Sequence, residues 1–232
     1  MRGLQGTQKV LKIQEMMSGK GEIIHYTHGT NLIRQFTGTR KGPTLAITAH
    51  HDNVYPEYEN CLDNTASVLN LVKIADRLEE QAPAHDVILA WTDQEESCSL
   101  DKIGVRHLID KYAIDYLLDL ELTASGSIPV ICEYGKFGYG SGMYWDSMIV
   151  SPMPFNNASA AWRIGGIKGS ACLTLISGSD LDELNNTGYC KRWLQCHQKS
   201  DTFDNWYSVV ESEVLVDNIV RSLVEYDLHQ TS

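Results

Sequence analysis

Short apolar runs alternate with amphipathic stretches along the first half of the chain. The runs over 44–49, 86–91 and 116–120 are nearly continuous, as in strands that are buried on both faces. Between them, apolar residues recur at helical spacing over 68–78 and again over 105–109. Strand, helix, strand, helix, strand predicts an α/β fold, with a mostly parallel twisted sheet and helices on both of its faces.

Outside this central unit, the last predicted helix has the best-defined pattern, with an apolar stripe over 216–224. The last predicted helix begins at a capping box, in which Ser208 is followed three residues later by Glu211. The middle of the chain is rich in glycine, serine and aromatic residues, which indicates long loops. The further predicted elements are a helix over 8–17, strands over 22–27 and 32–37, and loops over 134–170.

Composition adds a prediction of domain number and location. A chain of 232 residues with 43% hydrophobic content can bury one good core, and no repeat or linker divides it. We therefore expect a single domain over 1–232. The polar N-terminus lacks the apolar stretch of a secretory signal, and no run is long enough to span a membrane. Six scattered cysteines without a C-x-x-C pair fit the same expectation, a cytoplasmic protein.

The formal net charge of -11 narrows the choice of partners. Nucleic acids and anionic membranes are bound by basic surfaces, so neither is an expected partner. An acidic balance does not define a substrate by itself.

Polar side chains gather where the predicted strands end. His50 and Asp52 follow the first strand, Glu95 and Glu96 follow the second, and Asp119 lies near the end of the third. Ligands of open α/β sheets bind beyond the carboxyl ends of the strands. Each residue alone has an ordinary structural explanation, but carboxylates and imidazoles gathered at one edge are a ligand set suited to zinc.

Two further residues join this set, and the charges require compensation. Asp63 opens the helix after the first strand, and His197 lies in a later loop. Bringing Asp63, Glu96 and Asp119 together places about three negative charges within a few ångströms, which favours protonation or bound cations. Two divalent ions relieve that repulsion and leave about one net positive charge to polarise a carbonyl group.

The ordered set His-x-Asp, Asp-Asn, Glu-Glu, Asp, His resembles the zinc aminopeptidases of peptidase family M28, which also includes the glutaminyl cyclases. The individual motifs are short, but their order and spacing are specific, and they extend from residue 44 to about residue 204. The resemblance implies a single-domain zinc exopeptidase fold. The matching segments are 49–52, 62–67, 95–96, 117–120, and His197 with 200–202.

The resemblance also implies a role for each matching residue. Glu95 is then the general base, which takes a proton from the attacking water and delivers it to the leaving amine. Asp52 orients a histidine ligand through the other ring nitrogen. The implied zinc ligands are Asp63, which bridges two ions, His50 and Asp119 at one ion, and Glu96 and His197 at the other.

Spacing and departures refine the resemblance. Only 13 positions separate His50 from Asp63, and 101 separate Glu96 from His197, so neither interval holds a second domain. The glycines that flank the Asp-Asn pair in the family are absent here. Two alternatives remain open, because ligand chemistry alone does not separate neighbours: His51 in place of His50, and Glu121 in place of Asp119.

The sequence therefore predicts a zinc-dependent aminopeptidase that removes N-terminal residues from short peptides. One alternative on the same scaffold is a glutaminyl cyclase or another amidohydrolase, and the cyclases typically use a single zinc ion. A non-catalytic peptide-binding member is less favoured, because the complete ligand set and the base Glu95 are all present.

Overall fold

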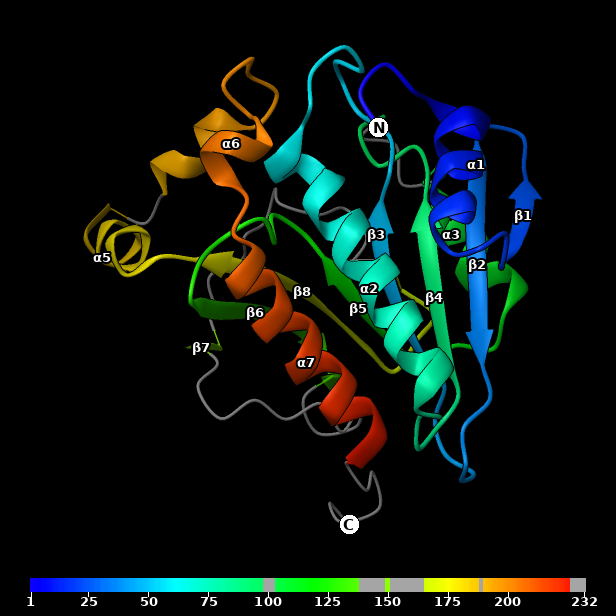
Figure 1. Cartoon of the computed structure of the whole chain (residues 1–232). Coiled ribbons are helices and arrows are strands. Elements are labelled where there is room, and N and C mark those ends of the chain that lie inside the picture. Colours follow the sequence, from blue (N-terminus) through cyan, green and yellow to red (C-terminus); the bar gives the residue numbers. More distant parts are fainter. Residues whose placement is uncertain (98–102, 138–148, 151–164, 188–189, 226–232) are drawn as a thin grey trace.

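One eight-stranded sheet forms the centre of the molecule (Figure 1). The computed structural model describes residues 1–97, 103–137, 149–150, 165–187 and 190–225. The order of strands across the sheet is β1-β2-β4-β3-β5-β8-β6-β7. The strands are β1 (Glu22–His25), β2 (Thr30–Phe36), β3 (Leu45–His50), β4 (Val87–Thr92), β5 (Tyr116–Leu120), β6 (Ile128–Gly135), β7 (Ile149–Val150) and β8 (Gly169–Ile176).

Parallel and antiparallel pairs occupy different parts of the sheet. The central strands β4, β3, β5 and β8 are parallel, as the sequence predicts. On one side β1, β2 and β4 pair antiparallel, and on the other side β8 and β6 do so. The α/β fold is confirmed as a mixed sheet whose centre is parallel, with one further parallel pair, β6 and β7, at an edge. Parallel strands end at the same edge, so this centre gathers the residues that follow β3, β4 and β5.

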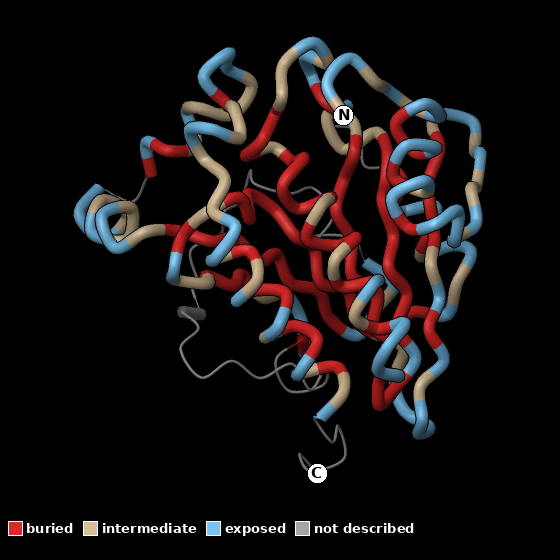
Figure 2. Tube along the Cα trace, in the orientation of Figure 1, coloured by how far each residue is buried: buried red, intermediate tan, exposed pale blue. Residues whose placement is uncertain are grey.

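Helices cover both faces of the sheet (Figure 1). Buried residues of α1, α2 and α7 share one apolar cluster with the strands, and α3 packs in a second cluster on the opposite face. Burial follows this layering, since the central strands and the inner sides of the helices are buried (Figure 2). The helices are α1 (Gly6–Met16), η1 (Cys61–Thr65), α2 (Ala66–Glu80), α3 (Gly104–Lys111), α5 (Gly178–Thr187), η3 (Lys191–Gln195), α6 (Phe203–Trp206) and α7 (Val209–Glu225).

The three predicted central strands are confirmed to within one residue, and the region 134–170, predicted as long loops with short elements, includes the ends of two strands. β6 extends to Gly135, and β8 begins at Gly169. Small and polar residues at the start of β8 hide its strand pattern, because their burial depends on neighbouring strands rather than on their own hydrophobicity. Within the predicted loop, 138–148 and 151–164 lie outside the described residues.

The first predicted helix is confirmed as α1, but only some of its apolar residues are buried. Val10 and Ile13 are fully buried, whereas Leu11 and Met16 are exposed by 50% and 40%. Lys9, one helical turn before Ile13, is buried in their place, with only 1% of its surface exposed. A lysine therefore enters the apolar layer between α1 and the sheet.

The last helix begins with half of the predicted capping box. The backbone N–H of Glu211 donates to the Ser208 hydroxyl at 3.3 Å. The Glu211 carboxylate accepts instead from the N–H of Gly126 at 2.7 Å, so it ties the helix to the strand layer. Among the described helices, none combines the length and apolar character that crossing a membrane requires.

Candidate metal centre

His50 stands at the carboxyl end of β3 and lies against two carboxylates. Its Nε2 is 2.9 Å from Oδ1 of Asp63, and its Nδ1 is 3.3 Å from Oδ1 of Asp52. Alternation along β3 places His50 on the same face as Ala46, which packs in the α3 cluster. The histidine is 2% exposed, so its ring orientation is fixed by the protein.

Asp63 lies in the irregular turn η1, which leads into α2. The peptide bond between Asp63 and Asn64 is cis. The side-chain amide of Asn64 donates to the carbonyl oxygen of Leu120 at 2.8 Å, and Oδ1 of Asp201 accepts from the N–H of Leu62 at 2.7 Å. Contacts on both sides of Asp63 thus fix the turn against β5 and against the loop that follows His197.

Asp52 connects the ends of β3 and β4. Its two carboxylate oxygens accept from the backbone N–H groups of Glu95 and Glu96, at 3.2 and 2.9 Å. Burial favours the neutral form of Asp52, but the contact with His50 and these N–H donors outweigh burial and lower its pKa. The family resemblance implies that Asp52 orients His50, and the structure adds that Asp52 also holds the Glu95-Glu96 loop in place.

His197 completes the cluster from the other side. Its Nε2 is 3.5 Å from Oδ2 of Asp63, and its Nδ1 is 3.6 Å from Oε1 of Glu96. Ligand atoms of His50, Asp63 and Glu96 all lie within 4.8 Å of one another. Four of the five predicted ligands are therefore brought together around one point. Glu95, the predicted base, is half-buried beside Glu96.

Asp119 lies in β5, and Glu121 is the first residue after the end of that strand. Asp119 is paired in register with Thr48, whose hydroxyl donates to Asp119 Oδ1 at 2.5 Å. Glu121 comes one pleat later and lies opposite His50, with Oε1 at 3.6 Å from Nε2. The structure thus places Glu121 beside His50, and it places Asp119 one layer deeper in the sheet.

His51 faces away from this cluster. Its Nε2 donates to the carbonyl oxygen of Thr30 at 2.8 Å, and the residue is fully buried. Burial lowers its pKa. Of the two neighbouring histidines, His50 is therefore the one that the structure directs toward Asp63.

The charges of the cluster fit a site for divalent cations. Burial and the nearby carboxylate of Asp63 raise the pKa of Glu96 to about 8. Burial also raises the pKa of Glu121, whose two oxygens have no hydrogen-bond partner among the described residues. Although burial opposes it, Glu121 and the aspartates at His50 raise the pKa of that histidine. Carboxylates and imidazoles forced together in this way are the donor set that zinc binds.

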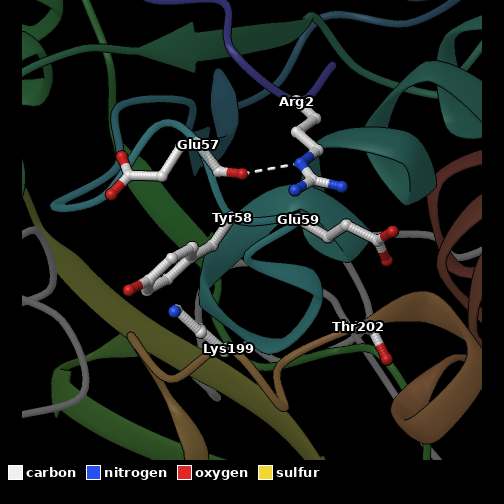
Figure 3. A pocket seen from close by; sticks show the side chains of 6 residues that line it. All are labelled: Arg2, Glu57, Tyr58, Glu59, Lys199 and Thr202. Carbon is white, nitrogen blue, oxygen red and sulfur yellow. Dashed lines mark hydrogen bonds between the residues drawn. The ribbon is translucent and has the colours of Figure 1, made fainter.

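A cavity of about 490 Å³ lies beside the two loops that carry Asp63 and His197 (Figure 3). Arg2 borders it and donates from Nε to the carbonyl oxygen of Glu57 at 2.6 Å. None of the metal-centre residues lines it, so it is a neighbouring hollow rather than the metal centre itself. Its lining residues are Arg2, Glu57, Tyr58, Glu59, Lys199 and Thr202.

Residues 31–151 match the sequence profile of peptidase family M28. The matched segment is more than half of the chain and contains His50, Asp63, Glu95 and Glu96. The chain therefore belongs to peptidase family M28. A comparison with curated proteins finds no match.

Solved structures share the fold at low sequence identity. LapA of Legionella pneumophila superposes with a TM-score of 0.67 and 14% identity, over 93% of this chain and 64% of LapA. BSAP, a zinc aminopeptidase from Bacillus subtilis, gives 0.56 and 16%, over 85% of this chain and 50% of BSAP. A Porphyromonas gingivalis glutaminyl cyclase gives 0.61 and 14%, over 91% of this chain and 87% of the cyclase. The chain thus spans less than two thirds of LapA and of BSAP.

Proposed function

We propose that the protein is a zinc-dependent aminopeptidase that removes N-terminal residues from short peptides. The observation that carries the proposal is the convergence of His50, Asp63 and Glu96 within 4.8 Å. Family membership and fold support a metal-dependent hydrolase. The narrower activity draws on BSAP, described as a zinc aminopeptidase, and on LapA, described as an aminopeptidase.

Two zinc ions per chain are the proposed complement, with Asp63 between them. His50 and Glu121 would hold one ion, and Glu96 and His197 the other. Glu121 replaces Asp119 in this assignment, because its carboxylate, just after β5, lies 3.6 Å from His50. Asp119 supports the layer below through its hydrogen bond with Thr48.

Bound divalent ions would supply a Lewis acid that polarises the scissile carbonyl and lowers the pKa of a water molecule. Glu95 acts as the general base: it takes a proton from the attacking water and passes it to the leaving amine. Asp52 keeps Glu95 in position through the backbone N–H, and it keeps the ring of His50 in one orientation. The surplus of carboxylates around the centre suits the free α-amine of a peptide, which favours an exopeptidase.

The proposal is tested by release of free amino acids from unblocked dipeptides and aminoacyl-anilides after zinc loading. We expect hydrolysis by the wild type and a loss of about 10²- to 10⁴-fold in Glu95→Gln, the usual contribution of a general base. Glu80→Gln, an exposed change on α2, is the matched control and should retain full activity. Full activity of Glu95→Gln would exclude this residue as the base.

Glutaminyl cyclase activity is the second candidate. The solved cyclase from P. gingivalis matches over most of its own length, unlike LapA and BSAP. Peptides with N-terminal glutamine separate the two activities, because cyclisation releases ammonia and leaves the peptide bond intact. A stoichiometry of one zinc per chain together with ammonia release would favour the cyclase.

A further inference from the structure

Lys9 is a buried cation outside the proposed ligand set. The residue is 1% exposed, and its Nζ has no hydrogen-bond partner among the described residues. Lysines are almost never fully buried without a partner, because removing the ammonium from water is costly. The position of Lys9 in the first turn of α1 therefore requires an explanation beyond packing.

The surroundings of Lys9 are acidic. Burial lowers its pKa to about 8, and the carboxylates that oppose this shift are Asp52, Asp63, Asp93 and Glu96. Two of these, Asp63 and Glu96, are proposed zinc ligands. Long-range attraction to the metal-centre carboxylates thus takes the place of a direct ion pair.

The alternation of the sheet explains how α1 reaches the centre. Even-numbered residues of β3 such as Ala46 face α3, whereas Ala49 packs in the cluster that contains α1. His50 therefore points to one side of the strand end and His51 to the other. On the α1 side, Asp93 accepts from the N–H of Thr30 at 2.9 Å, next to the His51 contact with the same residue. Lys9 interacts electrostatically with Asp93 and with His51, which both belong to this second polar layer.

We propose that Lys9 is a built-in countercharge of the metal centre, which competes with bound cations and weakens zinc affinity. In the metal-free site the ammonium offsets part of the carboxylate charge. Once cations occupy the site, the same ammonium faces like charge at close range. The inference rests on the proposed function only in that the site binds divalent ions.

Lys9→Met, which keeps the volume and removes the charge, tests this directly. We expect Lys9→Met to bind zinc about tenfold more tightly in competition with a chelator, because removal of one positive charge near the site lowers its repulsion of a dication. Lys9→Gln should show the same direction, which covers the case that the methionine variant folds poorly. Lys12→Met is the control, because Lys12 lies on the same helix and pairs with Glu15 in solvent; its zinc affinity should equal that of the wild type.

Unfolding measurements separate a countercharge from a packing residue. A packing role would change the stability of the metal-free and zinc-loaded protein equally, whereas a countercharge changes them unequally, with the zinc-loaded form of Lys9→Met gaining more. Equal zinc affinity in the wild type and both Lys9 variants would overturn the proposal. These binding measurements stand even if zinc-loaded wild type hydrolyses no peptide, an outcome that would overturn the proposed function alone.

Discussion

Two acidic side chains near the carboxyl end of β5 have different contacts. Asp119 is engaged by Thr48 inside the sheet, and Glu121 lies opposite His50 at its edge. The longer glutamate side chain also extends further beyond the strand end. At the residue scale, the assignment of one metal ligand therefore depends on which of two carboxylates, two positions apart in the chain, lies next to His50.

Substitution of these two residues should have unequal effects on zinc binding. We expect Glu121→Gln to weaken zinc affinity by more than about 100-fold and Asp119→Asn by less than about tenfold, because only the first removes a direct ligand. Chelator competition measures both. The reverse ranking would restore Asp119 as the ligand.

The raised pKa of Glu96 predicts a pH dependence with a definite sign. Its pKa rises from 4.5 to about 8, so between these values the folded metal-free protein retains a proton that the unfolded chain has released. This stabilisation is complete below about pH 4.5 and is lost as the pH rises through about 8. The free energy of unfolding of the metal-free wild type, measured with urea, should therefore fall relative to that of Glu96→Gln as the pH rises over this window. A constant difference between the two proteins would contradict the shift.

Zinc binding should show the opposite trend. An ion must displace the proton of Glu96, so apparent zinc affinity should rise with pH up to about 8, by up to about tenfold per pH unit. Affinity that is flat between pH 6 and 8 would mean that Glu96 is already ionised in the metal-free protein.

At the scale of elements, the turn η1 depends on a residue far away in the chain. Asp201 accepts from Leu62 N–H, and burial raises the pKa of its carboxyl to about 6. Asp201→Ala should lower the free energy of unfolding by about 1–3 kcal/mol, because it leaves a buried N–H group unpaired. Asp201→Asn keeps an acceptor oxygen and should lose less. If denaturant unfolding gave the same loss of free energy for Asp201→Ala and Asp201→Asn, the hydrogen bond to Leu62 would not be the source of the stabilisation.

The central elements could be predicted because their signals are local. The strands that end at His50 and Thr92 are continuous apolar runs, and α2 and α7 carry clear stripes of helical period. The choice of Glu121 over Asp119 could not be made in this way, since both residues share a face and only the register with β3 separates them. The burial of Lys9 could not be predicted for a related reason. Leu11 and Met16 are as apolar as the buried Val10 and Ile13, so only tertiary packing determines which side of α1 is buried.

At the scale of the whole molecule, the metal centre joins segments from most of the chain. Its residues come from β3, η1, the loops after β4 and β5, and the loop that contains His197. Binding of ions should therefore stabilise the entire fold. We expect zinc at 100 times its dissociation constant to add about 2.7 kcal/mol per site to the free energy of unfolding, seen as a rise in Tm that a chelator reverses.

A His197→Ala variant is the control for that measurement, because it removes a ligand that is one third exposed and lies outside the apolar core. Its zinc-dependent rise in Tm should be smaller, while its Tm without zinc should change little. An undiminished rise would show that His197 does not contribute to the stabilising site.

The contacts of Asp52 have a consequence for the timing of metal uptake. Because the Asp52 carboxylate accepts hydrogen bonds from the backbone N–H groups of Glu95 and Glu96, those two amide hydrogens should exchange with deuterium slowly in protein prepared without zinc. Zinc would then bind to a preformed site, and the Glu95-Glu96 loop would not have to become ordered around the ion. The rate of zinc uptake should accordingly be set by access to the site, and not by refolding of the loop.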